Sequence, residues 1–238
     1  MDTDSFNTSL PRPSAARPLL GMTVLVIEDS RFACEAMRLL CLRSGARIRR
    51  ADSLRAARRH LQVYRPSIVV VDIGLPDGSG DDLIRTLVVA NTRPQAIIGT
   101  SGDPDGEARA MTAGADGFLH KPITSLAAFQ SCLLDCLPPD RQPPGPRAIA
   151  AEDVQPDPIA YHDDLAHAAD VMTDDALDGS LNYVAQFLSG VAHSAADTHL
   201  EHAARQVTLK LNAGEPAEVE AATLNGLLQD RLSQRIAI

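Results

Sequence analysis

The stretch Ile-Val-Val-Val-Asp-Ile-Gly-Leu-Pro-Asp-Gly-Ser-Gly, residues 68–80, decides the fold of this chain. Its first four residues are apolar and β-branched, which is typical of a buried strand. Asp72 follows this run directly, and the Gly, Pro, Asp and Ser after it predict a loop before the next helix. In a parallel sheet, a polar residue at the end of a strand lies at the carboxyl edge, where ligand sites gather.

Three further apolar runs end in the same way. Glu28 and Asp29 follow Met-Thr-Val-Leu-Val-Ile, Thr100 follows Ala-Ile-Ile-Gly, and Lys121 follows Gly-Phe-Leu-His. If these runs are parallel strands of one sheet, all five polar side chains lie at the same edge. The sequence therefore predicts a single site built from Glu28, Asp29, Asp72, Thr100 and Lys121.

Helical stretches separate the strands and predict an α/β fold with a doubly wound, five-stranded parallel sheet. The strands are expected at 23–27, 47–51, 68–72, 96–100 and 117–120, and the helices at 31–44, 53–64, 79–90, 104–113 and 125–136. The second strand, Arg-Ile-Arg-Arg-Ala, has the weakest apolar pattern and is expected at an edge of the sheet. Ser30 and Ser53 are expected helix N-caps, and Gly45 is expected to end the first helix.

The residue types of the site indicate phosphoryl chemistry. Three carboxylates at one place repel one another and raise each other's pKa values, and a divalent cation removes that repulsion. Oxygen ligands favour a hard ion such as Mg²⁺, bound through carboxylates and phosphate oxygens. A carboxylate can also act as a nucleophile and form an aspartyl phosphate. A Lys ammonium and a Thr hydroxyl would then contact the phosphate oxygens.

Four motifs in this order resemble the receiver domain of bacterial response regulators, the phospho-accepting modules of two-component signalling. They are Val-Leu-Val-Ile-Glu-Asp-Ser at 24–30, Val-Val-Asp-Ile-Gly-Leu-Pro-Asp-Gly-Ser-Gly at 70–80, Gly-Thr-Ser-Gly at 99–102 and Gly-Ala-Asp-Gly-Phe-Leu-His-Lys-Pro at 114–122. The resemblance covers residues 21–137, about half of the chain, and implies a flavodoxin-like fold similar to that of chemotaxis receivers.

The resemblance also implies roles for individual residues. Asp72 would accept the phosphoryl group from a histidine kinase or a phosphotransfer protein, and Lys121, joined to Pro122 by a cis bond, would contact that group. The implied Mg²⁺ ligands are Glu28, Asp29, Asp72 and the backbone carbonyl of Gly74, and the implied switch pair is Thr100 and Phe118. The protein would then be a phosphoprotein with intrinsic autodephosphorylation and not an enzyme. As alternatives, Phe118 is a core aromatic residue, and Gly74 and Gly80 only form turns.

The rest of the chain divides into three parts. Residues 1–20 have no apolar segment of the signal-peptide type and are expected to be a flexible tail. Residues 138–158 contain seven prolines and are expected to form an extended linker that allows movement. Residues 159–238 lack strand patterns and predict a small all-α domain of no recognised family. Its helices are expected at 159–173, 177–196, 199–211 and 216–235.

Charge bears on the output of this second domain. Residues 151–238 contain 4 Lys/Arg and 15 Asp/Glu, a net charge of −11, whereas residues 21–137 have a net charge of +1. DNA binding depends on cations that neutralise phosphates, so this charge argues against a nucleic-acid target, and an unknown protein partner is expected. Two alternatives are a DNA-binding transcriptional regulator and a receiver coupled to an enzymatic output. The chain has no apolar run of membrane-spanning length, and a cytoplasmic location is expected.

Several other residues have both a structural and a functional interpretation. Two predicted helices each contain a pair of cysteines on one face, and together these could form a metal or redox site, although buried free thiols are the commoner case. The cysteines are Cys34, Cys41, Cys132 and Cys136. The first predicted helix, the second strand and the second helix share an arginine-rich face. This face either is exposed to solvent or contacts an acidic surface, which is that of a partner or of the acidic C-terminal domain. It consists of Arg43, Arg47, Arg49, Arg50, Arg55, Arg58, Arg59 and Arg65. His193 lacks the flanking residues of a phosphotransfer histidine.

Overall fold

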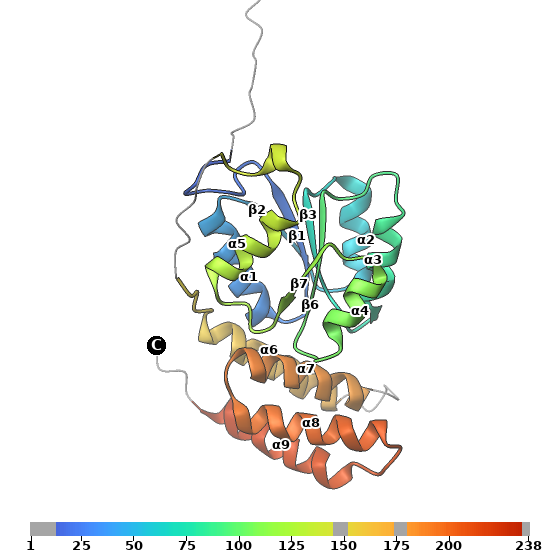
Figure 1. The fold of residues 1–238 in the computed structure, drawn as a ribbon. Helices are drawn as coiled ribbons and strands as arrows, with labels where there is room; N and C mark the ends of the chain where they lie inside the picture. The colour runs from blue at the N-terminus through green and yellow to red at the C-terminus, as the bar shows by residue number, and fades with distance from the viewer. Residues whose placement is uncertain (1–12, 145–151, 174–179, 235–238) are drawn as a thin grey trace, which may run out of the picture.

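The computed structural model describes residues 13–144, 152–173 and 180–234. Figure 1 shows an α/β layer formed by the first part of the chain and a helical bundle packed below it. The predicted pairing of a doubly wound parallel sheet with a smaller all-α region is confirmed.

The main sheet has five parallel strands in the order β2-β1-β3-β6-β7. The weakly apolar β2 lies at an edge, as expected. Each strand has nearly its predicted bounds: β1 Thr23–Ile27, β2 Arg47–Ala51, β3 Ile68–Asp72, β6 Ala96–Ser101 and β7 Gly117–His120. Between β3 and the next helix, β4 (Gly74–Leu75) and β5 (Gly78–Ser79) form a two-stranded antiparallel ribbon that the sequence pattern did not predict.

Helices cover both faces of the sheet, which explains why its inner strands are apolar throughout. On one face, α1 (Arg31–Ser44) and α5 (Leu126–Asp135) enclose a core that includes Met37, Leu40 and Phe129. On the other face lie α2 (Leu54–Val63), α3 (Gly80–Val88) and α4 (Gly106–Ala113). The side chains of Ser30 and Ser53 cap α1 and α2, and Gly45 ends α1 with φ 82°, so all three cap predictions are confirmed.

The C-terminal region contains α6 (Pro158–Thr173), α7 (Ser180–Ser194), α8 (Thr198–Asn212) and α9 (Glu218–Ser233). Leucine and valine side chains at helical spacing form its own core, as the sequence predicts. This core includes Leu165, Val184, Leu188, Leu200, Val207, Leu224 and Leu228. The first residues of the expected second helix, 177–179, lie outside the described residues. Within the described ranges, no helix has the length and apolarity needed to cross a bilayer.

The chain between the two bodies and the chain before β1 both differ from expectation. Residues 1–12 lie outside the described residues, but Leu19, placed in the predicted tail, is fully buried and its N–H donates to Ser44. Within the predicted linker, Val154 is buried in the core under α1 and α5, and Asp153 pairs with Ser125. Each segment is held by backbone hydrogen bonds and by a few apolar side chains, Pro18 and Leu19 in one and Val154 in the other. This pattern is too short to detect among prolines and polar residues. Among the described residues of the predicted linker, Pro139–Arg141 form a short 3₁₀ turn, and the side chain of Gln142 donates to the backbone oxygens of Leu134 and Leu137.

The helical bundle packs against the receiver-like layer through α6 and α7, which contact α1. In Figure 1 these two helices lie beyond the carboxyl ends of the sheet strands. The bundle therefore stands over the edge at which the predicted site residues gather.

Candidate functional site

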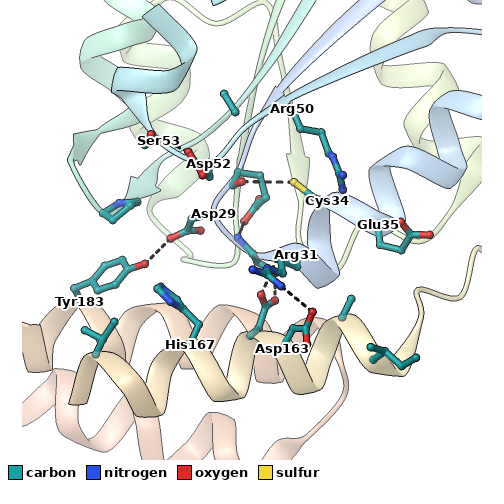
Figure 2. Close-up of a pocket in the computed structure, with 18 of the residues that line it drawn as sticks. Asp29, Arg31, Cys34, Glu35, Arg50, Asp52, Ser53, Asp163, His167 and Tyr183 are labelled. Atoms are coloured by element: carbon teal, nitrogen blue, oxygen red, sulfur yellow. Dashed lines mark hydrogen bonds and ion pairs between the residues drawn. The ribbon is translucent and has the colours of Figure 1, made fainter. Parts of the chain in front are cut away.

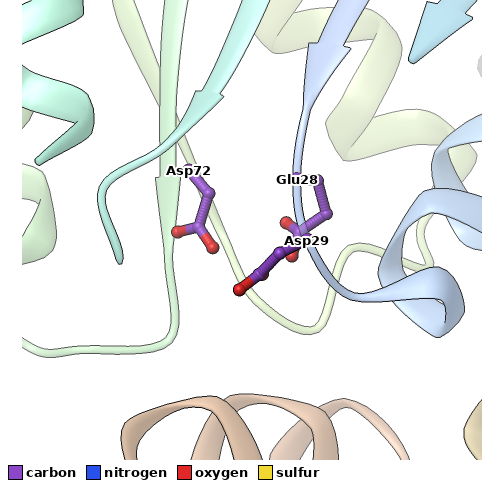
Figure 3. A group of neighbouring side chains, drawn as sticks. All are labelled: Glu28, Asp29 and Asp72. Atoms are coloured by element: carbon purple, nitrogen blue, oxygen red, sulfur yellow. The ribbon is translucent and has the colours of Figure 1, made fainter. Parts of the chain in front are cut away.

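Three carboxylates meet at the carboxyl edge of the sheet. Glu28 and Asp29 come directly after β1, and Asp72 is the last residue of the neighbouring strand β3. One oxygen from each residue lies within 4.8 Å of the others, and Figure 3 shows the three side chains pointing toward one another. Glu28 and Asp72 are buried, with 1% and 5% of their surfaces exposed. The sequence prediction that these residues share one site is confirmed by this geometry.

Lys121 lies between two of the carboxylates. Its Nζ is 2.8 Å from Asp72 Oδ2 and 2.7 Å from Glu28 Oε2, and the side chain is 8% exposed. Lys121 follows β7, which is separated from β3 by β6, so its long side chain reaches across the edge. The peptide bond to Pro122 is cis, as the resemblance implied.

The electrostatics of the site follow from burial and from like charges at short distance. Burial, aided by Asp72, raises the pKa of Asp29 from 3.8 to about 7. Burial also raises the pKa of Glu28 well above its ordinary value, with Lys121 opposing the change. For Lys121, burial works against the charged form, but Asp72, Glu28 and Asp29 outweigh it and raise the pKa of the ammonium. The site thus contains more negative charge than one lysine can neutralise, which favours a bound cation.

Thr100 and Phe118 lie on adjacent strands beside the carboxylates. Thr100 ends up fully buried, and its Oγ1 has no hydrogen-bond partner among the described residues. Phe118 is only partly buried and its ring packs edge-on against His120, with ring centroids 4.8 Å apart. Burying a hydroxyl without a hydrogen-bond partner costs folding free energy. The Thr100 hydroxyl is therefore suited to donate a hydrogen bond to an oxygen of a group that binds at this site. The switch roles of these two residues remain predictions.

Backbone geometry around the β3–α3 loop positions Asp72. The N–H of Gly74 donates to Asp72 Oδ1 at 3.2 Å, so both oxygens of Asp72 have a partner. A Cβ at Gly80 would lie 2.0 Å from the backbone oxygen of Asp72, so only glycine allows α3 to start this close to the strand. Gly80 therefore has a packing reason beyond a turn, whereas Gly74 has no heavy atom within 4 Å of its ideal Cβ position.

The residues of the edge fit a magnesium ion. They supply three hard oxygen ligands at one point, and burial, aided by the neighbouring carboxylates, raises the pKa values of Glu28 and Asp29. Glu28, Asp29 and Asp72 would hold the ion, and the carbonyl of Gly74 remains the predicted fourth protein ligand.

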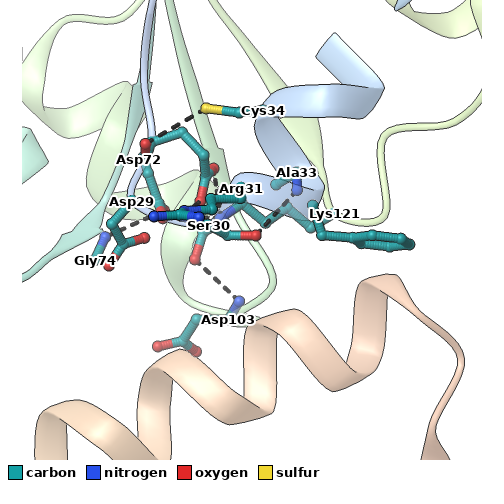
Figure 4. Close-up of polar contacts among 12 residues, drawn as sticks. Asp29, Ser30, Arg31, Ala33, Cys34, Asp72, Gly74, Asp103 and Lys121 are labelled. Carbon is teal, nitrogen blue, oxygen red and sulfur yellow. Dashed lines mark hydrogen bonds and ion pairs between the residues drawn. The ribbon is translucent and has the colours of Figure 1, made fainter. Parts of the chain in front are cut away.

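Residues of the helical bundle also reach this edge, although no sequence pattern singled them out. Asp164 on α6 accepts hydrogen bonds from Ser30 Oγ, Arg31 N and Phe32 N at 2.8, 2.8 and 3.1 Å. Tyr183 on α7 donates from its hydroxyl to Asp29 Oδ2 at 3.0 Å. Figure 2 shows Tyr183 pointing toward Asp29, and Figure 4 shows the contacts made around Ser30 and Arg31. No spacing or motif could have found these residues, because they act on groups more than 130 positions away.

A cavity of about 1250 Å³ opens between the two bodies and reaches Glu28 and Asp29. Its receiver side includes Arg31, Arg50 and Arg55, and its bundle side includes Asp163 and His167. The arginine-rich face predicted from sequence thus contributes to the walls of this cavity. Arg43 from the same face forms an ion pair with Glu152, which lies just before the buried Val154.

The other candidate residues are the cysteines and His193, and among them Cys34 lies beside the acidic edge, where its Sγ donates to the backbone oxygen of Glu28 at 3.5 Å. Cys34 and Cys41 are buried, and burial raises the pKa of each thiol, that of Cys41 to about 12. Cys132 and Cys136 are partly exposed, and their Sγ atoms donate to backbone oxygens of Phe118 and Asp116. Among the described residues, the one group placed to hold a metal is the carboxylate triad, not a cysteine cluster. His193 is paired with Glu201 at 3.0 Å inside the bundle.

Comparison with protein families gives a match over residues 24–130 to the Response regulator receiver domain. Over 100 residues, the chain is 29% identical to the KDP operon transcriptional regulatory protein KdpE of Escherichia coli (strain K12), covering 42% of this chain and 44% of that protein. Over 103 residues, it is 30% identical to the cell cycle transcriptional regulator CtrA of Caulobacter vibrioides, covering 43% and 45%. The chain thus spans less than half the length of these curated relatives.

Similar solved structures cover the same portion of the chain. The signal receiver domain of a signal transduction histidine kinase from Syntrophus aciditrophicus is 25% identical, with a TM-score of 0.44, covering 49% of this chain and 89% of that one. The receiver domain of a sensor histidine kinase from Pseudomonas aeruginosa, solved with a magnesium ion coordinated in its active site cleft, is 20% identical, with a TM-score of 0.44, covering 48% and 95%.

Proposed function

Because residues 24–130 are a response regulator receiver domain, we propose that this protein accepts a phosphoryl group on Asp72 from a histidine kinase or a histidine phosphotransfer protein. One observation carries the proposal: Asp72 shares its edge with two further carboxylates, and Lys121 Nζ lies 2.8 Å from its Oδ2. This arrangement has a nucleophile, a cation to steady the transferred group and ligands for a metal in one place.

The residues divide the work of the transfer. A carboxylate oxygen of Asp72 attacks the phosphorus of a phosphohistidine, the P–N bond breaks, and its electron pair leaves with the imidazole. Lys121 pairs with the incoming phosphoryl oxygens as it now pairs with Asp72 and Glu28. Mg²⁺ bound by Glu28, Asp29 and Asp72 supplies positive charge that offsets the charge of the phosphoryl group in transfer.

Thr100 provides the first response to the new group. Its buried hydroxyl, which has no partner among the described residues, donates to a phosphoryl oxygen and moves toward Asp72. Phe118, partly buried on the neighbouring strand β7, fills the space that Thr100 leaves. The phosphoryl group adds about −1.5 to −2 charges at neutral pH, so the change at this edge is large.

The output proposed for the helical bundle is protein interaction. Its supporting observation is the net charge of −11 over residues 151–238, which opposes contact with nucleic acid. The relatives named as transcriptional regulators are similar to this chain over its receiver part alone, so their DNA-linked output supports only a rival proposal here. An enzymatic output is the second rival, and no observation favours it.

The test uses acetyl phosphate as the phosphoryl donor and intact mass as the readout. Full-length protein with Mg²⁺ should gain one phosphoryl group, and Asp72→Asn should gain none. Asp103→Asn is the matched control, because Asp103 is exposed near the site but does not belong to the carboxylate triad. Labelling of Asp72→Asn at the wild-type level would refute the assignment.

A further inference from the structure

A buried carboxylate of the helical bundle, that of Asp164, contacts the amino end of the receiver helix α1. Asp164 on α6 is 2% exposed and accepts hydrogen bonds from three groups at the amino end of α1, those of Ser30, Arg31 and Phe32. The first N–H groups of a helix have no partner within the helix, and its amino end favours negative charge. Asp164 therefore satisfies donors that would otherwise need water, and it fixes α6 against α1.

Three more contacts surround that anchor. Tyr183 donates to the predicted metal ligand Asp29 at 3.0 Å, and Arg31 Nη1 lies 2.8 Å from Asp163 Oδ2. The rings of Phe32 and Tyr161 meet edge-on with centroids 5.8 Å apart. These contacts involve different side chains on two bundle helices, and all of them lie at or beside the carboxyl edge. We call the surface formed by Tyr161, Asp163, Asp164 and Tyr183 the α6–α7 face; it is complementary to this edge of the receiver.

Access to the edge differs for small and large molecules. The cavity between the bodies has a volume of about 1250 Å³ and reaches Glu28 and Asp29, so a small phosphate ester has room to enter. A protein donor must instead bring a folded surface to the same edge, and a single helix with its side chains is about 10–12 Å wide. The helices α6 and α7 already occupy that position (Figure 1).

We propose that the α6–α7 face is a receiver-docking surface whose occupant is the receiver of the same chain, and that it screens Asp72 from protein donors while small donors still reach it. This inference rests on the proposed phospho-acceptor role of Asp72. The docked bundle acts as a competitor in cis. A protein donor reacts with the undocked fraction alone, so its observed rate is the rate of the undocked protein multiplied by that fraction.

The variants that test this remove the anchors with little change in shape. Asp164→Ala with Asp163→Ala deletes two carboxylates that contact the receiver. The control pairs Asp230→Ala with Glu218→Ala, both at exposed sites on α9. The control loses the same groups but keeps every hydrogen bond of the α6–α7 face to the receiver.

The first measurement is hydrogen exchange on the full-length chain. The amides of Arg31 and Phe32, which donate to Asp164, should exchange about tenfold faster in the anchor variant than in the control. Exchange in α8, which has its own core residues Ala204 and Val207, should stay at the wild-type rate and show that the bundle is folded. Unchanged exchange at α1 would overturn the proposal, as would loss of protection in α8 together with α1.

The second measurement compares donors. Acetyl phosphate should label wild type, anchor variant and control at rates within about twofold of one another. A histidine phosphotransfer protein, phosphorylated with phosphoramidate, should label the anchor variant about tenfold faster than wild type, in line with the exchange result. Equal rates from the protein donor, or no transfer to the anchor variant, would overturn the docking proposal. Failure of acetyl phosphate to label Asp72 in any form would instead overturn the proposed function.

Discussion

Lys121 shows how three carboxylates are held together in a folded chain. Its ammonium lies within 2.8 Å of Asp72 and Glu28, and it is almost completely enclosed. It contacts two of the three acids, which leaves Asp29 with Tyr183 as its side-chain partner. Asp29 is half-buried, and burial, aided by Asp72, raises its pKa to about 7, so its protonation responds to pH near neutrality.

Magnesium affinity should therefore depend on pH. Below pH 7 the folded protein holds a proton on Asp29, which the metal must displace, whereas above pH 7 the carboxylate is ionised. The apparent affinity for Mg²⁺ should fall about tenfold per unit as the pH drops below about 7, and should level off above about 8. Because the ordinary pKa of Asp29 is 3.8, the metal-free protein should also lose stability as the pH rises from about 4 to 7.

Isothermal titration calorimetry with Mg²⁺ between pH 6 and 8 measures the predicted change. Asp103→Asn should keep the same pH dependence, because Asp103 is exposed outside the triad. An affinity that is constant across this range would show that Asp29 is already ionised at pH 6.

The lifetime of the phosphoryl group should depend on Gly102. This residue lies two positions after Thr100, and a Cβ there would meet nothing closer than Lys121 Cβ at 3.9 Å, so a side chain fits without strain. Gly102→Arg should obstruct the water that attacks the phosphoryl group and slow dephosphorylation about tenfold, which corresponds to about 1.4 kcal/mol of barrier.

Decay of the Asp72 phosphate after removal of acetyl phosphate provides the measurement. Gly226→Arg is the matched control, since Gly226 is exposed on α9 with open space around it. Decay of Gly102→Arg at the wild-type rate, with labelling intact, would place the water path elsewhere.

At the scale of elements, the site depends on how β3 passes into α3. The ribbon of β4 and β5 occupies the loop, and Gly80 N donates back to Ile73 O. This hydrogen bond holds the start of α3 against the backbone of Asp72, so close that a Cβ at Gly80 has no room. The loop thereby fixes the strand end that presents the phospho-acceptor.

Gly80→Ala should therefore destabilise the fold and impair phospho-acceptance. Its added Cβ would lie 2.0 Å from Asp72 O, so β3 and α3 must separate, and overpacking of this kind costs about 1–3 kcal/mol. Urea unfolding gives the free energy change, and acetyl phosphate labelling gives the effect on the site. Gly74→Ala is the matched control, with nothing within 4 Å of its Cβ. Equal stability of the two variants would show that the backbone relaxes freely at Gly80.

Across the whole molecule, charge is separated between the two bodies. The receiver is close to neutral, and the C-terminal region has a net charge of −11. The ion pair Arg31–Asp163 crosses between them, whereas Arg43–Glu152 joins α1 to the segment that packs on the receiver core. Exposed pairs of this kind contribute little, so the buried bonds of Asp164 are the larger part of the interdomain contact.

The same charge predicts that the protein does not bind DNA. With and without phosphorylation, the full-length chain should fail to retard a pool of genomic fragments at physiological salt, because few cations are available to replace counterions. A gel-shift titration is the measurement, repeated at low and high salt. Retardation at nanomolar protein that weakens steeply with salt would favour the rival, a DNA-binding regulator.

The sequence by itself determined the receiver fold and the residues of its acidic edge. Apolar runs predicted the five main strands because β-branched residues are buried in a parallel sheet, and the polar residue after each run falls at the same edge. Glu28, Asp29, Asp72 and Lys121 could therefore be placed together without coordinates. The caps at Ser30, Ser53 and Gly45 were equally local, since each acts on residues within one helical turn.

Only the tertiary structure decided where the helical bundle sits. Helical periodicity predicted α6–α9, but an amphipathic pattern specifies that a face is buried and not what covers it. Asp164 and Tyr183 look like ordinary polar residues in the sequence, and they gain a role only because packing brings α6 and α7 to the start of α1 and to Asp29. Leu19 and Val154 anchor segments that composition alone assigned to a tail and a linker. Contacts between residues this far apart leave no local signature, because they depend on how two finished surfaces fit.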